Sequence, residues 1–300
     1  MDLTIDLAGL KLRNPTMLSS GVLGISSSLL KRIYEAGAGC VVTKSIGPTP
    51  RHGYSNPCLV EVSSGYINAM GLPNPGVENF LEDLTELRKM NIPTIISIFG
   101  EDAPQFANIA RAVAEKGAMG LELNISCPHA EVSTIGQDPE ITKRVVKAVK
   151  KAVSIPIFVK LTPNVTNIVE IAVAAETAGA DGLTAINTVR AMTIDIYSKT
   201  PILNNKYGGL SGPAIKPIAI RCIYEIYENV KIPLIGVGGI TTWQDGIEFF
   251  LAGASALQIG TGIKYHGLTI FQDICAGISN YLTTEHYSNL SEIIGVAHDA

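Results

Sequence analysis

Several features that mark common protein classes are missing from this chain of 300 residues. Its five cysteines are scattered and no two form a CxxC pair, so we expect no zinc knuckle or iron–sulfur cradle within the chain. The net charge of −4 offers no basic face for a nucleic acid. No uninterrupted apolar run approaches the roughly 18–20 residues of a membrane helix, and residues 1–15 carry charges inside their apolar stretch, unlike a signal peptide. We therefore expect a cytoplasmic protein with reduced thiols.

Apolar residues are abundant instead, and they alternate between short and long segments. Hydrophobic residues make up 46% and charged residues 17%, which is typical of a well-buried globular protein. Amphipathic helices are expected, for example, at 104–116, 139–153 and 214–229, and Asp138 followed by Pro139 is a typical helix start. Short apolar runs predict strands buried on both faces at 15–21, 40–45, 94–100, 120–126, 157–163, 182–188, 233–239 and 256–262.

Eight strand–helix units predict an α/β fold, a (β/α)8 TIM barrel, as a single domain over residues 1–300. A weak repeat supports it, because four helices end at a glycine where a left-handed cap is expected: Gly37, Gly117, Gly179 and Gly253. A doubly wound open sheet is the alternative. The barrel is favoured because all eight strands end in polar or glycine residues, as if they converge on one site.

Two connections are too long for plain loops and are expected to be functional insertions over the C-terminal face of the barrel. The first covers residues 46–78 and has a strand-like segment at 58–62 followed by a turn at Ser64-Gly65. These features predict a small hairpin that lies over the barrel mouth. The second insertion covers residues 189–213.

The chemistry of a barrel enzyme belongs at the C-terminal ends of its strands. Here those ends carry serines, asparagines, glycines, two lysines and one thiol, without paired carboxylates or a metal cluster. Hydrolysis by two carboxylates or by zinc is therefore disfavoured. The last two strands carry GVGGI (236–240) and IGTG (259–262), whose backbone N–H groups can bind a phosphate. Tight turns alone are the alternative interpretation, and the absence of GxGxxG spacing argues against a Rossmann dinucleotide site.

Two residues stand out as reactive. Lys160 lies inside the apolar strand IFVKLTP, where an unpaired charge would be costly. It can present a fixed positive charge to a delocalised anion such as reduced flavin, form a Schiff base as in barrel aldolases, or simply pair with a carboxylate such as Glu122. Cys127 closes LELNISCP at a strand end, where a barrel holds its chemistry, whereas Cys40, Cys58, Cys222 and Cys275 are expected to be packing residues.

Six segments carry a resemblance to one family: NAMGLPNPG (68–76), ELNISCP (122–128), VKLTPN (159–164), INT (186–188), GGLSGPAIKP (208–217) and GVGGI (236–240). In this order they resemble the dihydroorotate dehydrogenases, most closely class 1 and its NAD-linked branch, class 1B. The resemblance runs from about residue 5 to about residue 285.

That resemblance implies FMN-dependent oxidation of (S)-dihydroorotate to orotate in de novo pyrimidine biosynthesis, with Cys127 as the base and hydride transfer to flavin N5. It implies no metal. The implied flavin contacts are Ser20, Lys44, Ser45, Asn124, Lys160, Ile186, Gly212, Gly238, Gly239, Gly260 and Thr261. The implied orotate contacts are Lys44, Asn68, Ala69, Met70, Gly71, Leu72, Asn124, Asn187 and Thr188.

The resemblance to class 1B also implies a partner subunit that carries FAD and a [2Fe–2S] cluster and reacts with NAD, in a heterotetramer built on a homodimer of this chain. Class 1A relatives instead work alone as dimers with fumarate. Two positions depart from the family pattern, since His129 and Ser97 stand where relatives usually have asparagine. The alternatives are a flavin barrel acting on another dihydropyrimidine, a Schiff-base aldolase using Lys160, and a non-catalytic module for a phosphorylated ligand.

Overall fold

The computed structural model describes residues 1–125 and 135–299. Its centre is a closed barrel of parallel strands in the order β10-β15-β16-β3-β4-β7-β8-β9. This confirms the predicted barrel over the open sheet, and each predicted strand is present with shorter ends. The bounds are β3 (Thr16–Leu18), β4 (Cys40–Val42), β7 (Thr94–Ile98), β8 (Gly120–Asn124), β9 (Ile157–Leu161), β10 (Gly182–Ala185), β15 (Leu234–Val237) and β16 (Ala256–Ile259).

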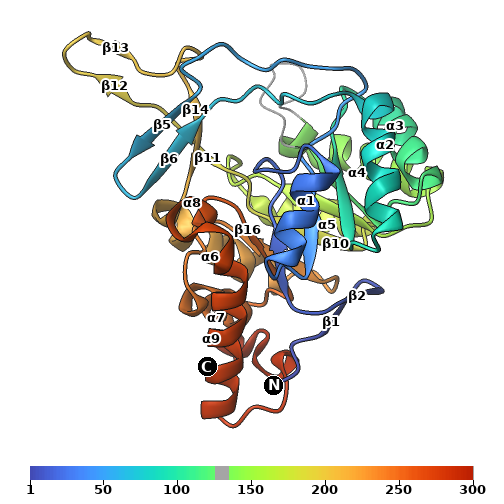
Figure 1. Cartoon of the computed structure of the whole chain (residues 1–300), viewed down its shortest axis with the longest axis vertical. Helices are drawn as coiled ribbons and strands as arrows, with labels where there is room; N and C mark the ends of the chain where they lie inside the picture. The colour runs from blue at the N-terminus through green and yellow to red at the C-terminus, as the bar shows by residue number, and fades with distance from the viewer. Residues whose placement is uncertain (126–134, 300) are drawn as a thin grey trace.

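Helices surround the barrel and cover the outward faces of its strands (Figure 1). Their bounds are α1 (Ser27–Glu35), α2 (Val77–Lys89), α3 (Ala103–Glu115), α4 (Pro139–Ala152), α5 (Ile168–Thr177), α6 (Lys216–Tyr227), α7 (Trp243–Leu251), α8 (Gly262–His266) and α9 (Ile270–Thr284). Asp138 caps α4 as predicted, because its carboxylate accepts from the backbone N–H groups of Glu140 and Ile141 at 2.8 and 3.0 Å. Within the described ranges, no helix is long and apolar enough to cross a membrane.

The barrel interior changes from apolar to polar along the strands. Its amino end is filled by an apolar cluster that includes Met17, Ile95, Phe158 and Ile235. A hairpin that the sequence analysis did not predict, β1 (Ile5–Leu7) and β2 (Leu10–Leu12), places its leucines in the same cluster and closes this end. Polar side chains therefore meet only towards the carboxyl end, where a site can form without weakening the apolar base.

The two predicted insertions form one antiparallel sheet, β11-β14-β6-β5. The first insertion supplies the predicted hairpin of β5 (Leu59–Val62) and β6 (Gly65–Asn68), and the second supplies β11 (Val189–Ala191) and β14 (Gly208–Ser211). The small hairpin β12 (Ile194–Asp195) and β13 (Thr200–Pro201) projects beyond this sheet, at the opposite end of the molecule from β1 and β2 (Figure 1).

The start of α7 is held by a capping box that follows directly after the GVGGI segment. The carboxylate of Asp245 accepts from the backbone N–H groups of Thr241 and Thr242 at 2.9 and 2.8 Å, and the Thr242 hydroxyl accepts from the backbone N–H of Asp245. Lys216 adds an ion pair with Asp245 at 2.9 Å. Burial alone would raise the pKa of Asp245, but these hydrogen bonds outweigh it and lower the pKa.

Replacement of Asp245 by asparagine removes the charge from this cap and keeps its shape. We expect Asp245→Asn to lower the free energy of unfolding by about 1–3 kcal/mol at neutral pH, because hydrogen bonds to a charged group are lost. The folded-state pKa lies below the ordinary 3.8. The difference between the two proteins should therefore be complete above about pH 4 and shrink as the pH falls below it.

Urea unfolding of both proteins between neutral and acid pH measures this difference. The control is Asp273→Asn, which alters an exposed aspartate in the first turn of α9 and should cost less than about 1 kcal/mol. Equal stabilities of Asp245→Asn and the unmodified protein at neutral pH would contradict the role assigned to this cap.

Candidate active site

The structure brings most of the predicted site residues to the carboxyl end of the barrel. Ser20 follows β3, Lys44 and Ser45 follow β4, and Asn124 ends β8, while Lys160 lies within β9. Ile186, Asn187 and Thr188 follow β10, Gly238 and Gly239 follow β15, and Gly260 and Thr261 follow β16. Gly212 follows β14, and residues 68–72 run from the end of β6. Site residues that are far apart in the sequence therefore lie together at the carboxyl end of the barrel.

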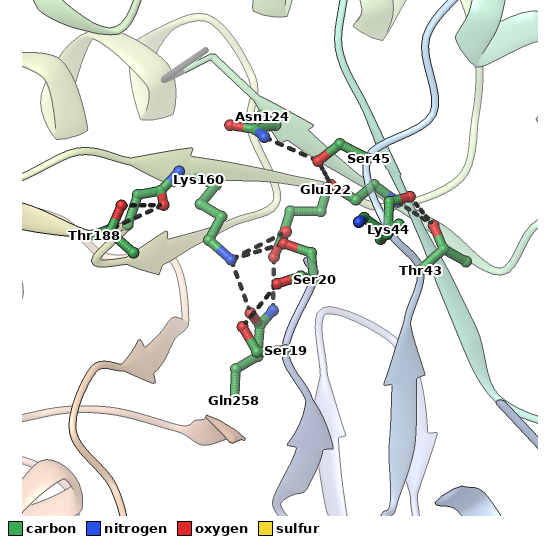
Figure 2. A network of polar contacts seen from close by, with 12 residues as sticks. Ser19, Ser20, Thr43, Lys44, Ser45, Glu122, Asn124, Lys160, Thr188 and Gln258 are labelled. Atoms are coloured by element: carbon green, nitrogen blue, oxygen red, sulfur yellow. Dashed lines mark hydrogen bonds and ion pairs between the residues drawn. The ribbon is translucent and has the colours of Figure 1, made fainter. Parts of the chain in front are cut away.

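Lys160 forms the centre of a buried polar cluster (Figure 2). Its ammonium donates to Ser20 Oγ at 2.9 Å, to Gln258 Oε1 at 3.3 Å and to Glu122 Oε1 at 3.5 Å. The side chains of Lys160 and Glu122 are only 5% and 0% exposed. The carboxylate partner that the sequence analysis named as an alternative is therefore present, and Lys160 also reaches the rim of the barrel through Ser20.

A second cluster joins three strand ends beside the first (Figure 2). Asn124 Nδ2 donates to Ser45 Oγ at 2.9 Å, and Ser45 Oγ lies 2.9 Å from Ser97 Oγ. Ser97, which departs from the family pattern, is completely buried. Ser97 therefore holds the Ser45 hydroxyl from the buried side of the cluster, and Ser45 and Asn124 lie closer to the barrel mouth.

The glycine segments form a cradle into which only backbone fits. Gly212, Gly238 and Gly239 have φ angles of +99°, +133° and +77°, a region that other residues rarely adopt. A Cβ at Gly239 would lie 2.9 Å from the carbonyl oxygen of Gly212 and 2.7 Å from Lys216 Cβ. The second insertion and the end of β15 thus approach each other closely. Adjacent glycines with positive φ can turn their backbone N–H groups towards a phosphate, so the residues present fit a phosphorylated cofactor.

The insertion sheet places the predicted substrate segment over the barrel. Asn68 Nδ2 donates to the carbonyl oxygen of Gly209 at 3.2 Å, and a Cβ at Gly209 would collide with the Thr188 hydroxyl. Thr188 in turn donates its backbone N–H to Asn187 Oδ1 at 2.8 Å. The amides of Asn68 and Asn187 therefore belong to one region, although they are 119 positions apart in the chain. Residues 69–72 continue from β6, and Gly71 and Leu72 both have positive φ angles.

Lys44 is a second cation at this end of the barrel, and it is half-buried. Burial lowers the pKa of Lys44, and the nearby Cys58 thiol opposes this effect only in part. No side chain in the described part of the chain forms a hydrogen bond or ion pair with its ammonium. An anionic ligand at the barrel mouth would supply a counter-charge that no described side chain provides.

Cys127 and His129 lie in residues 126–134, outside the described residues. The other cysteines have free thiols, and burial raises the pKa of Cys40 to about 12 and that of Cys222 to about 11. Neither thiol is suited to act as a base near neutral pH. Among residues 1–125 and 135–299, no group of His, Cys, Asp and Glu side chains could hold a metal ion.

Three polar residues of the site were missed in the sequence analysis. Gln258 faces into the barrel and donates to Glu122 Oε2 at 2.6 Å. Ser211 accepts from the Thr261 hydroxyl at 2.8 Å, and Asn74 accepts from the backbone N–H groups of Gly47 and Gly76. A signal existed only for Gln258, because a glutamine in the middle of an apolar barrel strand must find a buried partner.

Comparisons with known proteins identify the family of the chain. A family model described as dihydroorotate dehydrogenase matches residues 2–282. A protein of Pyrococcus abyssi is 54% identical over 297 residues, which are 98% of this chain and 99% of the relative. Proteins of Methanocaldococcus jannaschii and Pyrococcus furiosus are each 52% identical, over 99% of this chain and 98% and 99% of their own lengths. All three are named dihydroorotate dehydrogenase B (NAD(+)), catalytic subunit.

The buried ion pair allows a direct test of the site's energetics. We expect Lys160→Met to lower the free energy of unfolding by about 3–5 kcal/mol, because Glu122 would be left in the barrel without its cation. The double variant Lys160→Met/Glu122→Gln should recover a large part of this loss. Urea unfolding measures both effects, with Lys143→Met as the control, since its pair with Glu140 is at the surface and contributes about 0–1 kcal/mol. A double variant no more stable than Lys160→Met would refute the pairing.

Proposed function

The chain belongs to the dihydroorotate dehydrogenase family, and on this premise we propose that it oxidises (S)-dihydroorotate to orotate with one bound FMN, in the synthesis of pyrimidines. The observation that carries the proposal is the buried ammonium of Lys160, held at the barrel mouth on the same side as the glycine cradle. A fixed cation and a phosphate cradle at one barrel end are what a flavin nucleotide requires.

The glycines at the ends of β15 and β16 are proposed to hold the FMN phosphate through backbone N–H groups, together with Gly212 and Thr261. Lys160 would face the pyrimidine edge of the flavin, where negative charge develops on reduction. The remaining flavin contacts are proposed for Ser20, Lys44, Ser45, Asn124 and Ile186.

The substrate is a flat ring with a carboxylate and two imide carbonyls. Asn68, Asn124 and Asn187 carry amides that both donate and accept hydrogen bonds, which suits the ring edges. Lys44 supplies a cation that no described side chain neutralises, so it suits the substrate's negative charge. Thr188 and residues 69–72 complete the proposed pocket from the insertion sheet.

In the proposed reaction, Cys127 removes the proton from C5 of dihydroorotate. FMN, when bound, would supply a two-electron acceptor for the hydride at C6. Lys160 stabilises the negative charge that results, and the asparagine amides hold the ring so that both C–H bonds are presented correctly. The two electrons and one proton leave the substrate as a hydride, and the second proton leaves to the thiolate.

A Schiff-base aldolase is disfavoured by the geometry around Lys160. A lysine must be neutral to attack a carbonyl, whereas this ammonium has Glu122 as a buried counter-charge and donates to three side-chain oxygens. These contacts occupy the Lys160 nitrogen with acceptors and suit electrostatic stabilisation of a ligand rather than attack on a carbonyl.

The relatives are named as catalytic subunits of an NAD(+)-linked dehydrogenase. We therefore propose a partner subunit that carries FAD and a [2Fe–2S] cluster and passes electrons to NAD, around a homodimer of this chain. The thiols of the described residues support the division, because they form no cluster-binding group. A cytoplasmic location is part of this proposal and fits the free thiols.

The first test is the visible spectrum of the purified protein. We expect one FMN per chain and bleaching on anaerobic addition of dihydroorotate. In Cys127→Ser the bleaching should slow by orders of magnitude near neutral pH, because a hydroxyl is a far weaker base than a thiol, while orotate still binds. A colourless protein that cannot be reconstituted with FMN would overturn the flavin assignment, and unchanged kinetics in Cys127→Ser would remove that residue from the mechanism.

The second test concerns the electron acceptor. We expect the isolated chain to oxidise dihydroorotate with an artificial dye but to reduce NAD slowly. Steady-state assays of the lone chain with a dye, NAD and fumarate distinguish the possibilities. Rapid NAD reduction without a partner would contradict the two-subunit proposal, and rapid fumarate reduction would place the chain with the class 1A enzymes.

A further inference from the structure

Glu122 is a buried carboxylate that the proposed reaction does not use. It lies on β8, it is completely inaccessible to solvent, and the apolar layer of the barrel base lies on its amino side. A buried charge persists only where other groups compensate it.

The compensation of Glu122 spans the whole barrel. Gln258 lies on β16, which is separated from β8 by β3, β4 and β7 in the barrel order, and yet its amide reaches Glu122 Oε2 at 2.6 Å. The oxygen of the same amide accepts from Lys160 Nζ at 3.3 Å. Gln258 thus faces the carboxylate with its donor and the ammonium with its acceptor, which fixes the position of both charges (Figure 2).

The result is an electrically neutral unit, since one carboxylate accompanies one ammonium. We propose that Glu122 is a positioning residue that sets the reduction potential of the bound flavin by offsetting the charge of Lys160. This inference rests on the proposed function, in which Lys160 faces the flavin. A lone cation would strongly stabilise the reduced, negatively charged flavin and so raise its reduction potential. The negative charge of Glu122 weakens this stabilisation, and its contact with Lys160 keeps the ammonium in place.

The chain offers variants that separate charge from shape. Glu122→Gln removes the charge and keeps the side chain's size, so the flavin midpoint potential should rise. Gln258→Met removes the bridging amide and keeps both charges, so the potential should change much less. The double variant Glu122→Gln/Gln258→Glu moves the carboxylate to a position whose oxygen is already 3.3 Å from Lys160 Nζ, so the potential should return towards that of the unmodified protein.

The midpoint potential is measured by equilibration of the FMN-loaded protein with a reference dye. We expect Glu122→Gln to favour reduced over oxidised flavin at least tenfold more than the unmodified protein does, which for a two-electron couple is about 30 mV. Glu140→Gln, which removes a carboxylate from a surface ion pair on α4, is the matched control and should leave the potential unchanged.

An unchanged potential in Glu122→Gln, or an equal rise in Gln258→Met, would overturn the inference, because the effect would then be absent or merely structural. If Glu122→Gln alone does not fold, the double variant Glu122→Gln/Gln258→Met and the single variant Gln258→Met differ only in the charge at position 122, and the same rise is expected between them. A protein that binds no FMN refutes the proposed function, whereas an FMN-loaded protein whose potential ignores Glu122 refutes only this inference.

Discussion

The burial of one lysine inside an otherwise apolar barrel is the constraint on which the rest of the site depends. Lys160 stands two residues after Phe158 on the same face of β9, so its stem rises directly from the apolar base of the barrel. Such a charge is tolerable only with a nearby carboxylate and with polar groups that use its remaining donors. Glu122 on β8, Gln258 on β16 and Ser20 after β3 meet these needs, which explains why the barrel interior becomes polar at this level.

The upper part of the site depends on a different kind of contact. The insertion sheet is built from two segments that are more than 100 residues apart, and it joins them through β6 and β14. Glycines at positions 65 and 212 let the two insertions approach each other closely, because a Cβ at either position would meet the backbone of the other insertion. Gly209 lets the sheet approach Thr188, which follows barrel strand β10. The barrel therefore supplies the charged side chains of the site, and the insertions supply the amide of Asn68 and a sheet that covers the barrel mouth.

The sequence predicted the parts of this architecture that depend on local pattern. Eight apolar runs and the glycine caps at Gly37, Gly117, Gly179 and Gly253 were enough for the barrel, and all four glycines have positive φ angles. The β1–β2 hairpin was missed because each of its three-residue strands has a charged residue at its centre, Asp6 or Lys11, so neither strand forms a continuous apolar run. The sheet shared by the two insertions and the hydrogen bond from Gln258 to Glu122 were missed. Contacts between segments far apart in the sequence cannot be predicted from the residue pattern of one strand. The catalytic role proposed for Cys127 rests on the family resemblance and on its place in the sequence after β8.

The two lysines of the site differ in whether a described carboxylate lies beside them, and this difference suggests different roles. Lys160 has a protein carboxylate, and its net effect on a ligand is therefore moderated and constant. Lys44 has no such partner among the described side chains, and burial lowers its pKa. The binding of an anion would therefore stabilise its charged form more than it would stabilise that of Lys160. A cation that is compensated in advance suits a resident group whose charge changes during turnover. A cation left uncompensated suits a charged molecule that must bind and leave, since the binding of that molecule relieves the desolvation of the lysine. On this argument we propose that the charge of Lys44 acts mainly on the substrate's carboxylate and that of Lys160 on the flavin. The distinction follows from the Glu122 carboxylate beside Lys160 and from the lack of a described carboxylate beside Lys44.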